Sequence, residues 1–254
     1  MRVRRVVACL VLVAVVSGCT SVIAGNVRPA PGLKPRPLTG ETIKRVLLDD
    51  AALSRILDQP LTTKSDLPPR FGGPEKLQQN FGAVSPAECV GVTLMLAHGA
   101  YRSGPVKNVA RETWWNAATQ PATVIDVSEG VVALPTAADA TALFATFSQQ
   151  WDRCNGATVT ISSGSVAFAD QISDVRVVNS VLAATVSIQT RLAGSPTTGA
   201  RPEARALGVR GNCLVEVEVA FFSTRNPSDQ GTGDVNTSAI DIAHAMMDKV
   251  SALS

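Results

Sequence analysis

The chain has 254 residues, of which 45% are hydrophobic and 17% charged, enough apolar material for a sizeable core and too much for global disorder. Once Arg2, Arg4 and Arg5 of the first segment are set aside, the 23 basic residues fall to 20, against 21 acidic residues. This near-neutral balance argues against a nucleic-acid-binding protein.

Residues 1–18 have the layout of a secretory signal peptide. A basic start leads into an apolar run from Val6 to Val16, and Ser17-Gly18 stands directly before Cys19. A helix of this length covers about 16 Å, roughly half the hydrocarbon thickness of a bilayer, so we expect export rather than a permanent membrane span.

The tetrapeptide Val16-Ser17-Gly18-Cys19 resembles the bacterial lipobox. The resemblance implies that the Cys19 thiol receives diacylglycerol, that the chain is cut before Cys19, and that the new amino group is acylated, for example with palmitate. Two or three acyl chains anchor a protein essentially permanently, so we expect a membrane-anchored protein on the extracytoplasmic side. The alternative is an ordinary signal peptide followed by an incidental cysteine.

Residues 19–38 are predicted to be a tether. Their four prolines favour extended polyproline II structure, and such a stretch cannot build a core. The folded domain is therefore expected over residues 39–254. It should begin with a short helical hairpin over residues 42–57, continue through a mostly irregular segment over 60–87, and reach an apolar run over 87–97 whose helix or strand character the periodicity leaves open.

The middle of the chain is rich in Val, Ile and Thr, and its repeated short runs predict antiparallel strands. Apolar residues at helical spacing after Pro135 predict a helix over residues 136–151. Residues 193–202 are Gly, Ser, Thr and Pro without periodicity, which predicts a loop. The strands are expected over residues 106–115, 123–134, 157–161, 166–172, 175–178 and 181–190.

Residues 213–222 alternate, with Cys213, three valines and Phe221 on one face and Glu216 and Glu218 on the other. This pattern predicts a strand with one buried face and one exposed face. A polar loop over 224–233 then leads to a last helix over about 236–252. The predicted fold class is α+β.

Three cysteines remain in the mature domain: Cys89, Cys154 and Cys213. In an oxidising location an odd number allows at most one internal disulfide, and spacing alone does not choose among the three pairings. The position of Cys213 on the apolar face of a strand is typical of a buried free thiol, which favours a bond between Cys89 and Cys154.

Several short motifs, in order, resemble the extracellular sensor-domain family first described in the mycobacterial serine/threonine kinase PknH, which also occurs as free-standing lipoproteins. The resemblance covers residues from about 40 to the C-terminus. The motifs are Leu47-Leu48, Glu88-Cys89-Val90-Gly91, Tyr101-Arg102-Ser103-Gly104, Trp151-Asp152-Arg153-Cys154-Asn155-Gly156, Arg205-Ala206-Leu207 and Ile242-Ala243.

The resemblance implies a twisted antiparallel sheet backed by helices, with an open cleft that binds an extracellular ligand. It supports the Cys89–Cys154 disulfide and leaves Cys213 free. The family usually has a second disulfide, and the two corresponding positions here hold Glu203 and Phe221. We therefore expect that second bond to be missing.

Catalytic patterns are weak. No nucleophile elbow, zinc-protease or phosphate-loop motif occurs in the sequence, and no cofactor or metal ion is expected. Asp241, His244 and Asp248 share a helical face, Cys89 and His98 could pair as a thiol and a base, and Glu216 and Glu218 stand about 7 Å apart like paired glycosidase carboxylates. For each of these sets an ordinary solvated or structural role is the preferred interpretation.

Three aromatic residues are the candidate ligand contacts: Tyr101, Trp114 and Trp115. The two tryptophans should point to opposite faces of a strand, so one of them could be exposed. The leading hypothesis is a non-enzymatic, lipid-anchored envelope protein that binds a small molecule or envelope component. The alternatives are a module that docks on a protein partner and, less favoured, an envelope hydrolase.

Overall fold

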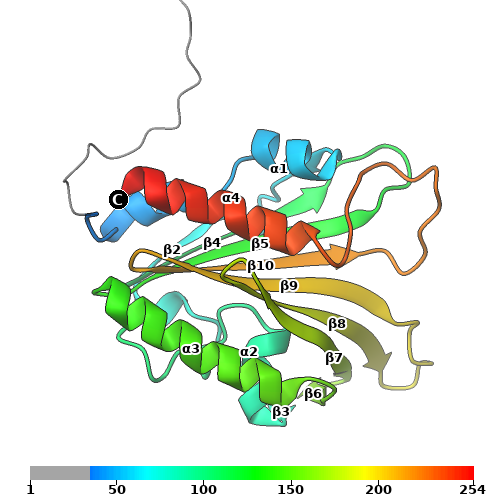
Figure 1. The fold of residues 1–254 in the computed structure, drawn as a ribbon. Helices are drawn as coiled ribbons and strands as arrows, with labels where there is room; N and C mark the ends of the chain where they lie inside the picture. Colours follow the sequence, from blue (N-terminus) through cyan, green and yellow to red (C-terminus); the bar gives the residue numbers. More distant parts are fainter. Residues whose placement is uncertain (1–34) are drawn as a thin grey trace, which may run out of the picture.

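The computed structural model describes residues 35–254, so the signal peptide, Cys19 and most of the tether lie outside the described residues. Ten strands form one antiparallel sheet in the order β1-β4-β5-β10-β9-β8-β7-β6-β3, with β2 paired to β4 (Figure 1). The strands are β1 (Leu61–Thr62), β2 (Arg70–Gly72), β3 (Ala83–Ser85), β4 (Asn108–Asn116), β5 (Val124–Ala133), β6 (Thr158–Ser163), β7 (Val166–Val178), β8 (Val181–Leu192), β9 (Arg201–Arg210) and β10 (Cys213–Phe221).

Helices cover both faces of this sheet. In Figure 1, α4 and α1 lie above the sheet and α3 and α2 lie below it. The expected α+β architecture of a twisted antiparallel sheet backed by helices is confirmed. The helical segments are the 3-10 turns η1 (Gly40–Val46), η2 (Pro74–Lys76) and η3 (Ala87–Cys89) and the α-helices α1 (Asp50–Leu57), α2 (Val90–Thr93), α3 (Ala137–Cys154) and α4 (Ser238–Leu253).

The helix α3 begins as the sequence predicts and ends one turn later. The Thr136 hydroxyl accepts the backbone N–H of Asp139, and the Asp139 carboxylate accepts the backbone N–H of Thr136, so a capping box fixes the start. Its buried stripe runs from Ala140 to Trp151 and continues to Cys154, and this last turn brings the cysteine to its disulfide partner.

The domain starts slightly earlier than predicted. Leu38, expected at the end of the tether, is 3% exposed, and its backbone N–H and C=O are both bonded to the side chain of Asn212. The predicted hairpin over 42–57 is confirmed as η1 followed by α1, with Asp49 capping α1 through the backbone N–H of Ala52.

Two further expectations need correction. Residues 166–178 form one strand, β7, instead of two, because Asp174 takes a left-handed conformation (φ 53°) and the ladder to β8 resumes beyond it. The apolar run over 87–97 is neither a helix nor a strand throughout. It forms η3 and α2 and then leaves regular structure at Leu94.

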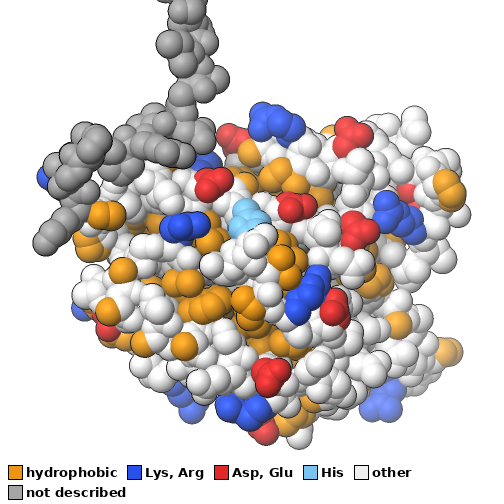
Figure 2. All heavy atoms as spheres, in the orientation of Figure 1, with side chains coloured by type: hydrophobic (Ala, Val, Ile, Leu, Met, Phe, Trp, Pro, Cys, Tyr) orange, Lys and Arg blue, Asp and Glu red, His pale blue; other side chains and the backbone are white. Residues whose placement is uncertain are grey.

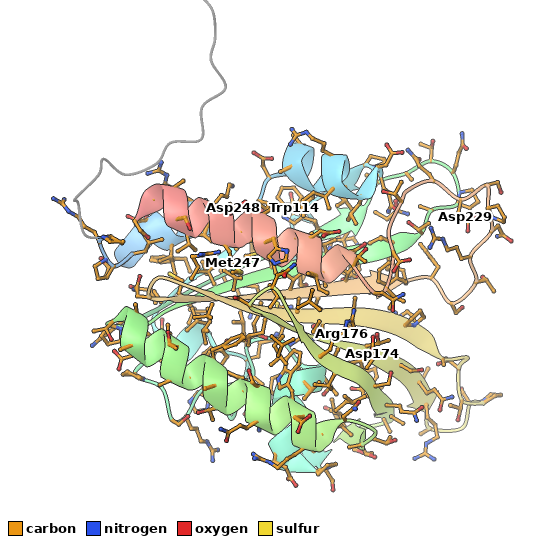
Figure 3. All side chains as sticks on the ribbon, in the orientation of Figure 1. Trp114, Asp174, Arg176, Asp229, Met247 and Asp248 are labelled. Carbon is orange, nitrogen blue, oxygen red and sulfur yellow. A yellow bond between two sulfur atoms is a disulfide. The ribbon has the colours of Figure 1, made fainter. Side chains whose placement is uncertain are left out.

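Each face of the sheet has its own core. The upper core lies under α4, where Met247 sits directly over Gly208 of β9 (Figure 3). The lower core lies under α3 and contains Phe147, Trp151 and the disulfide of Cys154. Figure 2 shows charges of both signs scattered over α1 and α4, with apolar side chains gathered in the band between α4 and α3.

Within residues 35–254, none of the helices combines the length and apolar character that a membrane crossing requires.

Candidate functional site

The second helical layer changes the environment of the glutamates in β10. Cys213, Val215, Val217 and Val219 face the upper core as the alternation predicts. The expectation that the opposite face is exposed is wrong, because α2 and the segment after it cover that face. Glu216 is 1% exposed and Glu218 only partly exposed.

A buried arginine on the neighbouring strand neutralises these two carboxylates. Arg205 of β9 is fully buried, and its Nη2 lies 2.9 Å from Oε2 of Glu216 while its Nη1 lies 3.0 Å from Oε2 of Glu218. Its Nε donates to the carbonyl oxygen of Val92 at 2.9 Å. The Arg205 side chain therefore ties β9 and β10 to α2.

The other oxygen of Glu216 is also satisfied. Oε1 accepts the Tyr101 hydroxyl at 2.5 Å and the backbone N–H of Leu96 at 3.2 Å. Burial, together with the negative charge of Glu216, raises the pKa of Tyr101 well above its usual value, so the phenol stays protonated and remains a donor. Leu96 itself has φ 56° and packs on Gly130 of β5, where a Cβ would come within 2.9 Å of it.

Beyond this network the lower face of the sheet is not covered by helix, and two hollows open there. The ends of β8, β9 and β10 at the right of Figure 1 extend past α3. The first hollow, called the Trp115 hollow, has a volume of about 280 Å³. It is lined by Leu67, Pro68, Arg70, Arg111, Glu112, Thr113, Trp115, Asp126, Ser128 and Glu218.

The second hollow, called the Glu203 hollow, has a volume of about 210 Å³. Glu218 lines both hollows, so they lie side by side at this residue, and together they are called the groove. The lining of the second hollow comprises Phe81, Thr93, Leu94, Ile161, Phe168, Asp170, Ile188, Arg201, Glu203 and Glu218.

Asp126, Asp170 and Glu203 of the groove hold their protons unusually tightly. Burial, reinforced by the charge of Glu218, raises the pKa of Asp126 to about 6 and that of Asp170 to about 7. The same two causes raise the pKa of Glu203 well above its usual value. A cluster of perturbed acids in an open groove marks it as a functional-site candidate.

Three polar atoms at the groove are buried without a hydrogen-bond partner: Oδ1 of Asp170, Oε1 of Glu203 and Nε1 of Trp115. Buried polar groups are nearly always bonded, and leaving one unbonded costs about 1–3 kcal/mol. The groove therefore has hydrogen-bonding capacity that the chain itself does not use.

The three aromatic candidates fall in three different environments. Tyr101 is 2% exposed and packs edge-on against Phe147, so the expectation that it contacts a ligand is not supported by its position. Trp114 points to the other side of the sheet, against the upper core (Figure 3). Trp115 lines the groove, with Nζ of Lys64 3.8 Å from its ring centroid. The predicted opposite orientation of the two tryptophans is confirmed.

Of the groove acids, only Glu218 is a candidate from the sequence, as one of a possible carboxylate pair. Arg111, Asp126 and Asp170 carry no site prediction, and Glu203 is marked only as a position where the family usually has a cysteine. A signal was nevertheless present, because a charged residue inside a Val-rich strand is rarely buried unless it is paired.

The expected disulfide is present between Cys89 and Cys154, with the Cα atoms 5.6 Å apart. Cys213 is a buried free thiol within the described part of the chain, and burial raises its pKa to about 12. Since Cys89 is bonded, it does not form a thiol–base pair with His98.

Among residues 35–254, no three His, Cys, Asp or Glu side chains are grouped so as to hold a metal ion. His244, on the same face as Asp241 and Asp248, lies near the carbonyl oxygen of Asn179 at 3.3 Å. The paired-carboxylate interpretation of Glu216 and Glu218 fails for Glu216, because Arg205, Tyr101 and Leu96 occupy both of its oxygens.

The family of this chain follows from a match over most of its length. The family model described as PknH-like extracellular domain matches residues 38–249. The chain belongs to the PknH-like extracellular domain family. The match starts at Leu38, the residue at which the fold itself begins.

Two curated relatives of this PknH-like domain are the serine/threonine-protein kinases PknH of Mycobacterium bovis and of Mycobacterium tuberculosis. They are 23% and 24% identical over 88% and 80% of the chain, which spans 35% and 30% of their lengths. The chain thus resembles about a third of each kinase, and the matching family describes an extracellular domain. Membership of that family indicates an extracytoplasmic location.

A solved structure has the same fold. The crystal structure of the extracellular domain of PknH from Mycobacterium tuberculosis superposes with a TM-score of 0.67, covering 85% of this chain and 98% of that chain at 20% identity. The expected architecture of this PknH-like domain is confirmed by that match.

Proposed function

We propose that this protein is a lipid-anchored cell-envelope protein whose PknH-like domain binds a small molecule or envelope component in the groove, without catalysing a reaction. The single observation that carries the proposal is the composition of the Trp115 hollow. A tryptophan with an unused indole N–H stands beside the cationic Arg111 and the carboxyl group of Asp126 in an open concavity. A few convergent polar groups beside an aromatic wall are typical of ligand sites.

The chemistry of the hollow suits recognition of a polar ligand. Arg111 offers a fork of donors, Asp126 and Glu218 offer acceptors, and the hydroxyls of Thr113 and Ser128 can do either. The Thr113 and Ser128 hydroxyls already bond to each other, with 2.9 Å between the two oxygen atoms, which fixes their positions on adjacent strands. Because the floor is a sheet, these groups are held on a rigid frame before a ligand arrives.

The anchoring part of the proposal is supported by the lipobox resemblance at Val16-Ser17-Gly18-Cys19 and by a family of extracellular domains. It is tested by replacing Cys19 with Ala and labelling cells with a radioactive or clickable fatty acid. The proposal predicts loss of acyl labelling and an unprocessed or released protein. Unchanged labelling and membrane fractionation would refute the anchor.

The binding part is tested by a thermal-shift screen of the purified protein against envelope lipids, glycans, peptidoglycan fragments and small metabolites. A ligand at 100 times its dissociation constant adds about 2.7 kcal/mol, which corresponds to several degrees in a domain of this size. Trp115→Phe should weaken the hit, and Trp114→Phe is the matched control on the opposite face. Silence across the screen would favour a module that docks on a protein partner.

A further inference from the structure

The Glu203 hollow differs in chemistry from the Trp115 hollow. Part of its lining is apolar and comprises Phe81, Leu94, Ile161, Phe168 and Ile188. The same hollow is also lined by the carboxyl groups of Asp170, Glu203 and Glu218. At about 210 Å³ the space suits the end of a ligand, since pockets for whole drug-sized ligands measure roughly 300–1,000 Å³.

Two of these carboxyl groups are buried, and their hydrogen bonding is incomplete. Asp170 is 3% exposed and Glu203 is 4% exposed, and each has one oxygen without any hydrogen-bond donor. Both side chains line the same hollow from β7 and β9, the two strands that flank β8. A donor placed in the hollow by a ligand would complete them.

The basic residues nearby do not provide that donor. Arg205 is held by Glu216, Glu218 and two backbone carbonyls of α2, so four of its five N–H donors are already engaged. Arg201, at the start of β9, lines the hollow but is exposed to solvent. An anionic ligand would meet three carboxyl groups here, whereas a cation would gain charge-assisted hydrogen bonds.

We propose that the Glu203 hollow is a subsite for an organic cation, a primary ammonium or guanidinium group carried on an apolar body. The cationic head contacts the carboxyl groups of Glu203 and Asp170, and the apolar body packs against Phe81, Leu94 and Phe168. This inference rests on the proposed function, because it specifies what one end of a groove ligand must be.

The proposal also predicts that binding of the cation is coupled to proton release. Burial and the charge of Glu218 raise the pKa of Asp170, opposed by Arg201. Burial and the charges of Glu218, Asp126 and Asp170 raise the pKa of Glu203, opposed by Arg205. A bound cation favours the ionised carboxylates, so binding releases protons and affinity rises with pH through neutrality. A neutral or anionic ligand would not release protons in this way.

The experiment compares phenethylamine with two analogues of similar shape, 2-phenylethanol and 3-phenylpropionate, by calorimetric titration of the purified protein. Repeating the titration in buffers with different ionisation enthalpies measures the protons released. We expect the amine to bind at least tenfold more tightly than either analogue, with proton release. Glu203→Gln and Asp170→Asn should each weaken the amine about 10- to 100-fold, since a charged hydrogen bond contributes about 1.5–3 kcal/mol.

Asp248→Asn is the matched control, because Asp248 is an exposed acid on α4, on the other side of the sheet (Figure 3). It should bind the amine like the unmodified protein. Equal binding of the alcohol and the amine, no amine binding at millimolar concentration, or full binding by both groove variants would overturn the cation inference. The proposed function fails separately, if the library screen gives no hit that depends on Trp115.

Discussion

The buried Arg205–Glu216 pair predicts a large and specific loss of stability. Arg205→Met keeps the bulk of the side chain but leaves Glu216, which is 1% exposed, without its countercharge. Breaking a buried pair in this way costs about 3–5 kcal/mol, because an uncompensated charge stays in the interior. At about 2–4 °C per kcal/mol in a domain of this size, the melting temperature should fall by about 6–20 °C.

Two further variants test whether the loss of stability comes from breaking the Arg205–Glu216 pair. Arg205→Met combined with Glu216→Gln removes both charges while the amide oxygen can still accept from Tyr101 and Leu96, so the double variant should be more stable than Arg205→Met alone. Arg176→Met is the surface control: Arg176 pairs with Asp174 in β7, both side chains are partly open to solvent, and the loss of this pair should cost under about 1 kcal/mol (Figure 3). The assay is urea denaturation followed by circular dichroism. If Arg205→Met costs no more than Arg176→Met, the interpretation of a buried, structural pair is refuted.

The remaining predictions concern the disulfide, the groove acids and the upper core. Replacing Cys89 and Cys154 by Ala opens a loop with a sequence separation of 65 and should cost about 4 kcal/mol in denaturation experiments, and thiol titration of the unfolded, unreduced mature protein should find one thiol. Three thiols there would contradict the pairing. Asp170, with its pKa raised to about 7, binds its proton in the folded state but releases it near pH 4 when unfolded, so stability should fall as pH rises from about 4 to about 7. Asp170→Asn should flatten that fall and gain at most about 4 kcal/mol relative to the unmodified protein at pH 8, and an unchanged pH profile of the melting temperature would count against a raised pKa. Gly208→Val places its Cβ within 2.5 Å of Sδ of Met247 and should cost about 1–3 kcal/mol, whereas Gly99→Ala, with open space around it, should be neutral. Equal melting temperatures for these two variants would refute the close packing of α4 on β9.

The sequence was most informative where a pattern is local. The apolar stripe of α3 follows from spacing alone, and the alternation over residues 213–222 predicted β10 (Cys213–Phe221) to within one residue. The same alternation predicted that Glu216 is exposed to solvent, and this prediction is wrong. Period-two patterning shows which residues share a face, but whether a second layer covers the polar face depends on α2 and Leu96, more than 100 residues away in the chain.

The groove could not be predicted from the sequence for a related reason. It brings together Trp115 of β4, Asp126 of β5, Asp170 of β7, Glu203 of β9 and Glu218 of β10, whose proximity depends on the strand order. Consecutive strands predict only hairpins, whereas the order β5-β10-β9 places the last strand, β10, next to β5 in the centre of the sheet. The family resemblance supplied the expectation of a cleft, but not its acidic lining.

The central claim, that the groove binds a ligand, is tested most directly by the indole resonances of ¹⁵N-labelled protein. The chain has three tryptophans, and they lie in three environments: Trp114 in the upper core, Trp151 in the lower core and Trp115 in the groove. Titrating a hit from the thermal-shift screen should move the Trp115 resonance progressively while those of Trp114 and Trp151 stay in place. A stabilising ligand that moves either core tryptophan and leaves Trp115 unchanged would contradict the account.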